Sequence, residues 1–310
     1  MAQIPIQIVD AFAERPFTGQ PAAIIPNASG LTDEQMLQIA EELGMEAGFV
    51  MPPAQREADV RLRFFTRRRE ATFSGHVVVA AFLGLADRGF FKPTAAGLQL
   101  HQETAAGVFA VTLTREADRR TRVSFELPRP RFGELVPAAE VATALDIPLA
   151  AIGLNDHGPQ RVSCGFDVIV VPVARREVMR GSFRNLDTMR ELADRRGVSG
   201  FALFCPHTFS TSADFHCRFL FPAEVCCEEP VSGTSLASVS AYAVEHGLLA
   251  GDERVEVVTE QGHSMGRPSQ VVTEVRSLGG RVSRVCVTGT GMVVMRGALT
   301  LVPGMQAAAV

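Results

Sequence analysis

Two glycines, each at the start of a long apolar segment, lie next to the side chains that could do chemistry. Gly75 is followed by His76, and Gly233 is followed by Thr234 and Ser235. A helix that begins at glycine exposes unpaired backbone amides at the positive end of its dipole, and no Cβ blocks a ligand. Two such starts would suit a small carboxylate, with His76 as an acid or as a hydrogen-bond donor to the substrate. The simpler interpretations are a tight turn at each glycine and a capping role for His76.

The two segments are copies of one pattern. Residues 73–89 (FSGHVVVAAFLGLADRG) and residues 231–247 (VSGTSLASVSAYAVEHG) have the same length and the same Ser-Gly start. An arginine-containing strand and an acid precede each: Arg63 and Glu70 in the first copy, and Arg218 and Glu229 in the second. Glu228 is interpreted as a solvated loop acid. This order predicts an internal duplication into two similar domains, because the period is too long for a solenoid.

The elements that must position these residues follow from hydrophobic periodicity. Residues 31–43 predict an amphipathic helix with Thr32 as N-cap, and residues 76–87 predict the first central helix. Residues 138–147 and 185–197 also predict helices, most other segments predict strands, and the Pro-spaced residues 127–137 suggest a crossing linker.

The predicted fold is α+β, with two similar domains related by a pseudo-two-fold axis. Each would be a mixed or antiparallel barrel-like sheet wrapped around a long central helix. We expect the domains at residues 1–130 and 131–293, with a C-terminal strand over residues 294–310 joining the first.

Composition excludes several classes of protein. The 310 residues are 46% apolar and 21% charged, and a net charge of -4 argues against a nucleic-acid or anionic-membrane surface. The arginines at residues 61–69 precede Glu70 and are interpreted as a solvated strand edge. No apolar run approaches the roughly 18 residues of a membrane span, and no signal peptide is evident, so a cytoplasmic location is expected.

Cysteine and histidine spacing gives no metal motif. The six cysteines form no CxxC pair, and they are interpreted as reduced, mostly buried thiols: Cys164, Cys205, Cys217, Cys226, Cys227 and Cys286.

Five stretches together resemble the PhzF-like family of phenazine-biosynthesis isomerases, which shares the two-domain fold of diaminopimelate epimerase. They are VDAFAERPFTGQPAAII, MLQIAEELGMEAGFV, RFFTRRREATFSGH, DFHCRFLFP with EEPVSGTS, and EQGHSMGRPS. The resemblance covers nearly the whole chain. It implies an active site in the cleft between the domains, no metal and no organic cofactor, a small carboxylate substrate and a homodimer.

The resemblance also assigns roles to residues. It makes Glu46 the general acid/base, although the sequence alone favours an exposed acid at the start of a strand. Its apolar neighbours could desolvate it and raise its pKa. The substrate would be held by residues at the two helix starts and by one acid: Gly75, His76, Glu229, Gly233 and Thr234.

Departures from the family pattern leave alternatives open. Glu229 replaces an aspartate and Thr234 replaces a serine, which predicts a substrate other than the dihydro-hydroxyanthranilate of phenazine synthesis. Ser74 stands where related racemases carry a catalytic thiol, so one carboxylate fits better than two thiols. The same changes also suit a binding or interaction protein without turnover. A dinucleotide site at residues 289–297 (GTGMVVMRG) is disfavoured, since no third glycine or helix follows.

Overall fold

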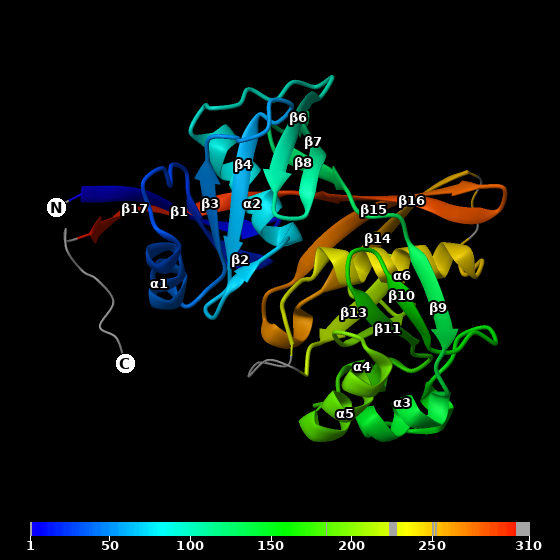
Figure 1. Cartoon of the computed structure of the whole chain (residues 1–310). Coiled ribbons are helices and arrows are strands. Elements are labelled where there is room, and N and C mark those ends of the chain that lie inside the picture. Colours follow the sequence, from blue (N-terminus) through cyan, green and yellow to red (C-terminus); the bar gives the residue numbers. More distant parts are fainter. Residues whose placement is uncertain (1, 184, 223–227, 250, 252, 302–310) are drawn as a thin grey trace. The chain divides into compact units, whose positions relative to one another are not determined.

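The computed structural model describes residues 2–183, 185–222, 228–249, 251 and 253–301 (Figure 1). Cys226 and Cys227 lie outside these residues. The chain divides into two compact units. The first comprises Met1–Phe125 with Gly289–Val310, and the second comprises Glu126–Thr288.

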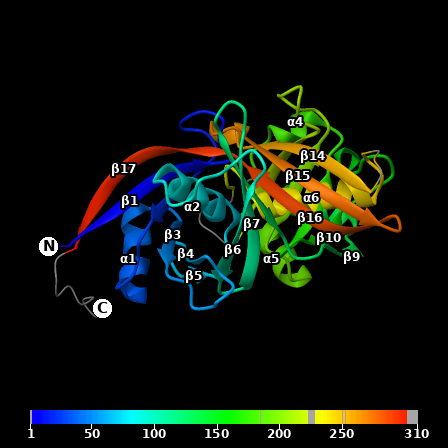
Figure 2. The same ribbon diagram turned by 90° about the horizontal axis from the view of Figure 1, so that it is seen from above.

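The first unit is a mixed sheet with two helices. Its helices are α1 (Asp33–Leu43) and α2 (Gly75–Asp87). Its strands are β1 (Ala2–Ala11), β2 (Gln20–Ile25), β3 (Ala47–Met51), β4 (Val60–Phe65), β5 (Glu70–Ala71), β6 (Leu98–Thr104), β7 (Gly107–Arg115), β8 (Thr121–Glu126) and β17 (Gly291–Leu301). β17 pairs antiparallel with β1, and Figures 1 and 2 show these ends of the chain running side by side.

Local sequence explains both helices of this unit. Thr32 caps α1, because its hydroxyl accepts a hydrogen bond from the Gln35 amide while the Gln35 side chain accepts one from the Thr32 amide. α2 is apolar on every side, and its residues from Gly75 to Leu85 are buried. A helix that is apolar all round is stable only inside a core, so α2 is the central helix that the sequence predicts.

The second unit repeats this scheme with more helices. Its helices are α3 (Ala138–Leu145), η1 (Leu149–Ala151), α4 (Arg176–Met179), α5 (Leu186–Arg196), α6 (Gly233–Glu245) and η2 (His263–Met265). Its strands are β9 (Arg131–Leu135), β10 (Gln160–Ser163), β11 (Asp167–Pro172), β12 (Phe201–Cys205), β13 (Phe215–Leu220), β14 (Arg254–Gln261), β15 (Ser269–Leu278) and β16 (Arg281–Gly289).

α6 is the buried helix of this unit, although it carries hydroxyl side chains. Ser238 and Ser240 donate to the carbonyls of Thr234 and Leu236, one turn earlier in the helix. These bonds satisfy the hydroxyls, so polar residues can be buried at little cost.

Two sequence predictions about local structure are corrected. The predicted linker over residues 127–137 contains β9, which pairs antiparallel with β10. Pro128, Pro130 and Pro137 flank this strand, so every residue within it keeps an amide hydrogen. Arg63 is not a solvated strand-edge arginine, since its side chain is only 14% exposed.

Strand pairing demonstrates the duplication in three dimensions. In the first unit β2 pairs parallel with β3, and β3 pairs antiparallel with β4. In the second unit β11 pairs parallel with β12, and β12 pairs antiparallel with β13. A Ser-Gly sequence and the buried helix follow each set. No helix among the described residues is long and apolar enough to cross a membrane.

Candidate active site

Glu46 lies between the end of α1 and the start of β3. Gly44 ends α1 in the left-handed conformation (φ 65°), which turns the chain into the strand. The Glu46 carbonyl then accepts a hydrogen bond of 3.0 Å from the Ala23 amide, which fixes the residue beside β2. The Glu46 side chain is 26% exposed, so it is accessible to a ligand.

Gly48 allows Glu46 to approach the start of α2. A Cβ at Gly48 would lie 2.6 Å from Cγ1 of Val77, which is closer than real Cβ contacts. β3 therefore packs directly on the first turn of α2 through a position that only glycine can occupy without displacement. This close packing brings the Glu46 carboxylate to the residues at the helix start.

Ser74, His76 and Glu46 form a compact polar cluster. The Ser74 hydroxyl donates a 2.7 Å hydrogen bond to Oε2 of Glu46, and it lies 3.4 Å from Nδ1 of His76. Nε2 of His76 lies 3.5 Å from the same carboxylate oxygen, and it is buried without a hydrogen-bond partner among the described residues. Within the described part of the chain, Oε1 of Glu46 accepts no hydrogen bond either. The cluster thus offers one oriented carboxylate with an open oxygen beside an imidazole.

Burial decides the charge of the imidazole. The His76 side chain is 7% exposed. Burial lowers the pKa of His76 below its ordinary value, and the neighbouring Glu46 carboxylate only opposes part of this shift. A neutral His76 can accept or donate a single hydrogen bond, which suits a substrate-positioning group.

The sequence predicted Glu46, Gly75 and His76 but assigned no role to Ser74. Ser74 is the N-cap of α2, yet its hydroxyl caps no helix amide. A serine at an N-cap usually bonds to the second or third amide of the helix. Here the hydroxyl is directed to Glu46 instead, and the sequence carries no signal for this contact.

The corresponding helix start in the second unit has the same backbone and different side chains. Ser232 is the N-cap of α6 and also makes no side-chain cap, while Ser235 donates back to the Ser232 carbonyl at 3.0 Å. Thr234 is 7% exposed and its methyl group faces Gly165. The amides at Gly233 and Thr234 are the features that could meet an anion.

Glu229 is positioned by the loop that follows β14. The Glu229 carbonyl accepts a 2.8 Å hydrogen bond from Nε2 of Gln261. Gly262 has φ 85°, and a Cβ there would lie 2.6 Å from the Pro230 carbonyl oxygen. The glycine in EQGHSMGRPS is therefore required by both backbone conformation and close packing, and it holds the segment that carries Glu229.

The acid equivalent to Glu70 is Glu228 and not Glu229. Both oxygens of Glu228 accept from Arg218, at 2.8 and 2.6 Å, as both oxygens of Glu70 accept from Arg63 at 2.7 Å. Backbone pairing gives the same equivalence, since Phe65 pairs with Glu70 and Leu220 pairs with Glu228. The interpretation of Glu228 as a solvated loop acid is wrong, because its side chain is only 12% exposed and pairs with a buried guanidinium.

The second unit has no counterpart of the Glu46 carboxylate. The Ile169 amide donates to the Gly200 carbonyl as the Ala23 amide donates to that of Glu46, so Gly200 occupies the equivalent position. A Cβ at Gly200 would lie 2.1 Å from the Leu220 carbonyl oxygen. No side chain fits there.

Cysteine side chains among the described residues do not supply a thiolate. Burial raises the pKa of Cys164 to about 12 and that of Cys286 to about 11. Burial also raises the pKa of Cys205 and of Cys217. These thiols are protonated near neutral pH and are unsuited to act as bases.

Comparison with known proteins identifies the family. The profile of the phenazine biosynthesis-like proteins (PhzC-PhzF) matches residues 9–297. An uncharacterised isomerase of Clostridium acetobutylicum is 27% identical over 298 residues, which are 94% of this chain and 97% of that protein. Trans-2,3-dihydro-3-hydroxyanthranilate isomerase of Pseudomonas aeruginosa is 27% identical over 292 residues, which are 92% of this chain and 95% of that enzyme.

A solved structure extends the similarity to three dimensions. The crystal structure of the PhzF-family phenazine biosynthesis protein of Bacillus anthracis matches with a TM-score of 0.87 and 25% identity, covering 97% of this chain and 100% of that one. The predicted fold class is confirmed, and so is the enzyme class, an isomerase. The chain belongs to the phenazine biosynthesis-like (PhzC-PhzF) family.

Proposed function

We propose that the protein is a single-base isomerase that moves a proton on a small unsaturated, amino or hydroxy carboxylic acid. Glu46 is the acid/base in this proposal, and no organic cofactor or metal takes part. The observation that carries it is the carboxylate held at 2.7 Å by Ser74, with its other oxygen open and a buried imidazole 3.5 Å away.

Ser74 and His76 act on the substrate through position and polarity. The Ser74 hydroxyl holds one oxygen of the carboxylate, which orients the side chain and leaves its other oxygen open. Nε2 of His76 would bond to a polar group of the substrate beside the reacting carbon. Glu229 would help to position the substrate, and the amides of Gly75 and Gly233, with Thr234, would bind anionic groups and stabilise developing negative charge.

The proposed reaction has one base because Gly200 occupies the position of Glu46 in the other copy of the duplication. Glu46 would remove a proton from a carbon activated by the adjacent carboxylate or double bond, and then return it to a second carbon. A single group reaches one face of the substrate, so it suits transfer between two positions on that face. Inversion at one carbon needs an acid on the opposite face, which a single glutamate does not supply.

Solvent isotope exchange tests the proposal directly. A panel of unsaturated amino and hydroxy acids, including trans-2,3-dihydro-3-hydroxyanthranilate, would be incubated in deuterated water and followed by NMR. We expect Glu46→Gln to reduce deuterium incorporation by roughly 100-fold or more, the range for general acid/base catalysis. Glu42→Gln is the matched control, because Glu42 is an exposed acid on α1 of the same unit.

Two outcomes would contradict the proposal. Unchanged exchange in Glu46→Gln would remove Glu46 from the mechanism. Tight binding of an acid from the panel without any exchange of a carbon-bound proton would favour a binding protein without turnover. Ser74→Ala separates the roles further, since it should reduce exchange while leaving the acid in place. We also propose that the protein is a homodimer, which sedimentation analysis would test.

A further inference from the structure

A second cluster of titratable side chains lies in the second unit, away from the helix starts. It consists of His216 on β13, Glu260 on β14 and His263 in η2. β13 and β14 pair in parallel with His216 directly opposite Glu260, so strand register brings these two side chains together. Gln261 ends β14 and η2 follows at once, which returns His263 to the same place.

The three residues present ligand atoms of a metal site. One nitrogen from each histidine and one carboxylate oxygen lie within 4.8 Å of one another. Nδ1 of His216 is 3.2 Å from Oε1 of Glu260. Donor atoms around a tetrahedral zinc ion, bound at about 2.0–2.1 Å, lie about 3.3 Å apart. His216 and Glu260 already have this spacing, and His263 needs a shift of less than about 1.5 Å to complete it.

Burial makes these atoms unusual. His216 is 4% exposed and Glu260 is 1% exposed. Nδ1 of His263 is buried without a hydrogen-bond partner among the described residues, and Nδ1 of His216 contacts only Glu260, at 3.2 Å and outside good hydrogen-bond geometry. Buried polar atoms in native proteins almost always have a partner, so the unpaired nitrogen of His263 beside this pair indicates a missing ligand.

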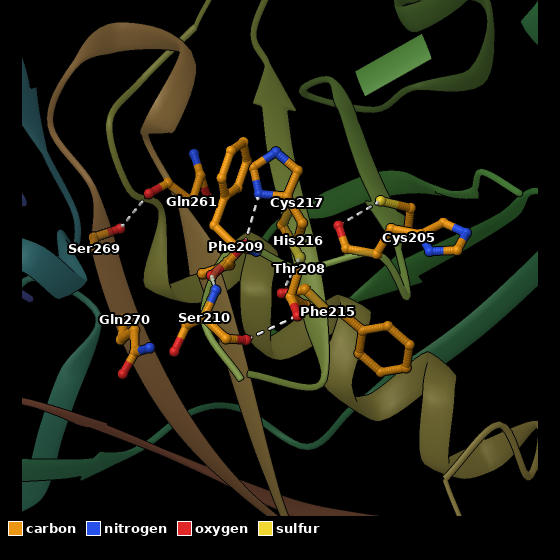
Figure 3. A network of polar contacts seen from close by, with 12 residues as sticks. Cys205, Thr208, Phe209, Ser210, Phe215, His216, Cys217, Gln261, Ser269 and Gln270 are labelled. Carbon is orange, nitrogen blue, oxygen red and sulfur yellow. Dashed lines mark hydrogen bonds and ion pairs between the residues drawn. The ribbon is translucent and has the colours of Figure 1, made fainter. Parts of the chain in front are cut away.

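The Glu260 carboxylate is held in place by its surroundings. The amides of Phe209 and Ser210, in the loop between β12 and β13, donate to its two oxygens at 2.6 and 2.9 Å (Figure 3). Burial acts to raise the pKa of Glu260, but the contact with His216 and these amide bonds outweigh it and lower the pKa. Hydrogen bonds of this kind orient ligating carboxylates in metal sites.

The third ligand is also held. The Phe209 ring stacks on the His263 ring at 4.3 Å and 9°, and Arg176 lies over Phe209 at 4.4 Å. The stacked ring fixes the plane of the His263 imidazole, which lies 5.4 Å from the His216 ring and beside Glu260.

We propose that His216, Glu260 and His263 bind a divalent transition-metal ion of the Zn²⁺ class through three protein ligands. Two imidazole nitrogens and one carboxylate favour such an ion over Mg²⁺ or Ca²⁺, which prefer oxygen ligands. Arg176 lies over the Phe209 ring at 4.4 Å and is not one of the proposed ligands.

The ion would have a structural role. His263 opens η2, and the next residue, Ser264, donates a 2.9 Å hydrogen bond to Glu228. His216 lies on the same strand as Arg218, which binds Glu228. A metal that joins β13, β14 and η2 would therefore fix the loop that supports the segment of residues 228–230.

Cobalt provides the test, because it substitutes for zinc and has visible absorption bands that report coordination. Protein stripped with a chelator would be titrated with Co²⁺ and then with Zn²⁺. We expect one Co²⁺ per chain, with intense bands typical of four-coordination, and displacement by one Zn²⁺. His263→Gln should weaken Co²⁺ binding by about 100-fold or more, since even outer-shell changes cost 10–100-fold. His207→Gln is the matched control, because His207 is exposed in the loop that carries Phe209 and Ser210.

A second measurement needs no variant. Zn²⁺ should shift the imidazole nitrogen resonances of two of the seven histidines in the unmodified protein. Absence of stoichiometric binding would overturn the proposal. So would equal Co²⁺ affinity of the unmodified protein and a folded His263→Gln variant, or shifts that spread over all histidines. None of these results depends on activity, so the metal site and the proposed isomerase function fail independently.

Discussion

The two equivalent arginine–glutamate pairs differ in burial, which predicts unequal effects of the same substitution. Arg218 is 7% exposed and Glu228 is 12% exposed. Arg63 is 14% exposed, but its partner Glu70 is 36% exposed. Each glutamate would be changed to glutamine, which keeps the side-chain volume and removes the charge.

The expected loss of stability depends on which hydrogen-bond acceptors each arginine retains after the substitution. Removing one partner of a buried pair costs about 3–5 kcal/mol, because the other charge stays buried without compensation. Arg218 retains two carbonyl acceptors, those of Met179 at 2.9 Å and Gly181 at 2.6 Å, so Glu228→Gln should fall near the lower limit. Glu70→Gln should cost about 1 kcal/mol or less, since an exposed pair contributes little. Arg63 also retains Asp33 at 2.7 Å.

The chain offers a probe for the second unit alone. It has no tryptophan and a single tyrosine, Tyr242, which is fully buried in α6. Tyrosine fluorescence during urea unfolding therefore reports the second unit, and far-ultraviolet circular dichroism reports the whole chain. With a typical slope of about 2 kcal/mol per M, Glu228→Gln should lower the fluorescence midpoint by roughly 1–2 M urea. Glu70→Gln, which lies in the first unit, should move the circular-dichroism midpoint by less than about 0.5 M.

Equal shifts for the two variants would refute the reasoning, because burial would then not determine the cost. A large shift of the circular-dichroism midpoint for Glu70→Gln would do the same. The paired design removes the effect of glutamine itself, since both variants carry the same substitution in the same structural context.

Two further predictions concern the first unit. Gly48→Ala should lower the melting temperature, since overpacking against Val77 costs about 1–3 kcal/mol. Gly158→Ala is the control, because a Cβ at Gly158 faces open space and should leave the melting temperature unchanged. An unchanged melting temperature for Gly48→Ala would contradict the packing argument. The pKa of His76 is lower in the folded chain than its ordinary value of 6.5. Its contribution to folding stability is therefore complete above pH 6.5 and is lost as the pH falls below that value, because the unfolded chain takes up the proton first. His76→Gln should therefore flatten the decline of the melting temperature between about pH 7 and pH 5, and parallel declines would argue against a buried neutral imidazole.

Local features of the fold could be predicted from the sequence because they depend on neighbouring residues. The capping box of α1 needs only Thr32 and Gln35, and the burial of α2 follows from an apolar sequence with no polar face. The Ser-Gly starts and the duplication were visible for the same reason. β9 was missed because three prolines suggested a linker, although they lie outside the strand.

Contacts between distant segments could not be predicted. The direction of the Ser74 hydroxyl depends on how closely β3 packs on α2, which is set by Gly48 and Val77. The choice of Glu228 over Glu229 as the partner of Arg218 depends on the bridge to Leu220. His216 and Glu260 meet only because β13 and β14 pair in parallel, and no spacing in the sequence encodes that register.

The duplication separates the supporting structure from the chemistry. Both copies keep the arginine–glutamate pair, the serine before the helix and the glycine that opens it. The arginine–glutamate pair links a strand to the segment before the helix in each copy, whereas the Ser74 hydroxyl contacts Glu46. The reactive positions differ: Glu46 corresponds to Gly200, and His76 corresponds to Thr234. Because the Leu220 carbonyl would clash with any side chain at Gly200, a second base cannot be restored there by a single substitution. A carboxylate at this position of the second unit would thus require β12 and β13 to separate, so the two copies cannot carry the same acid at the position of Glu46.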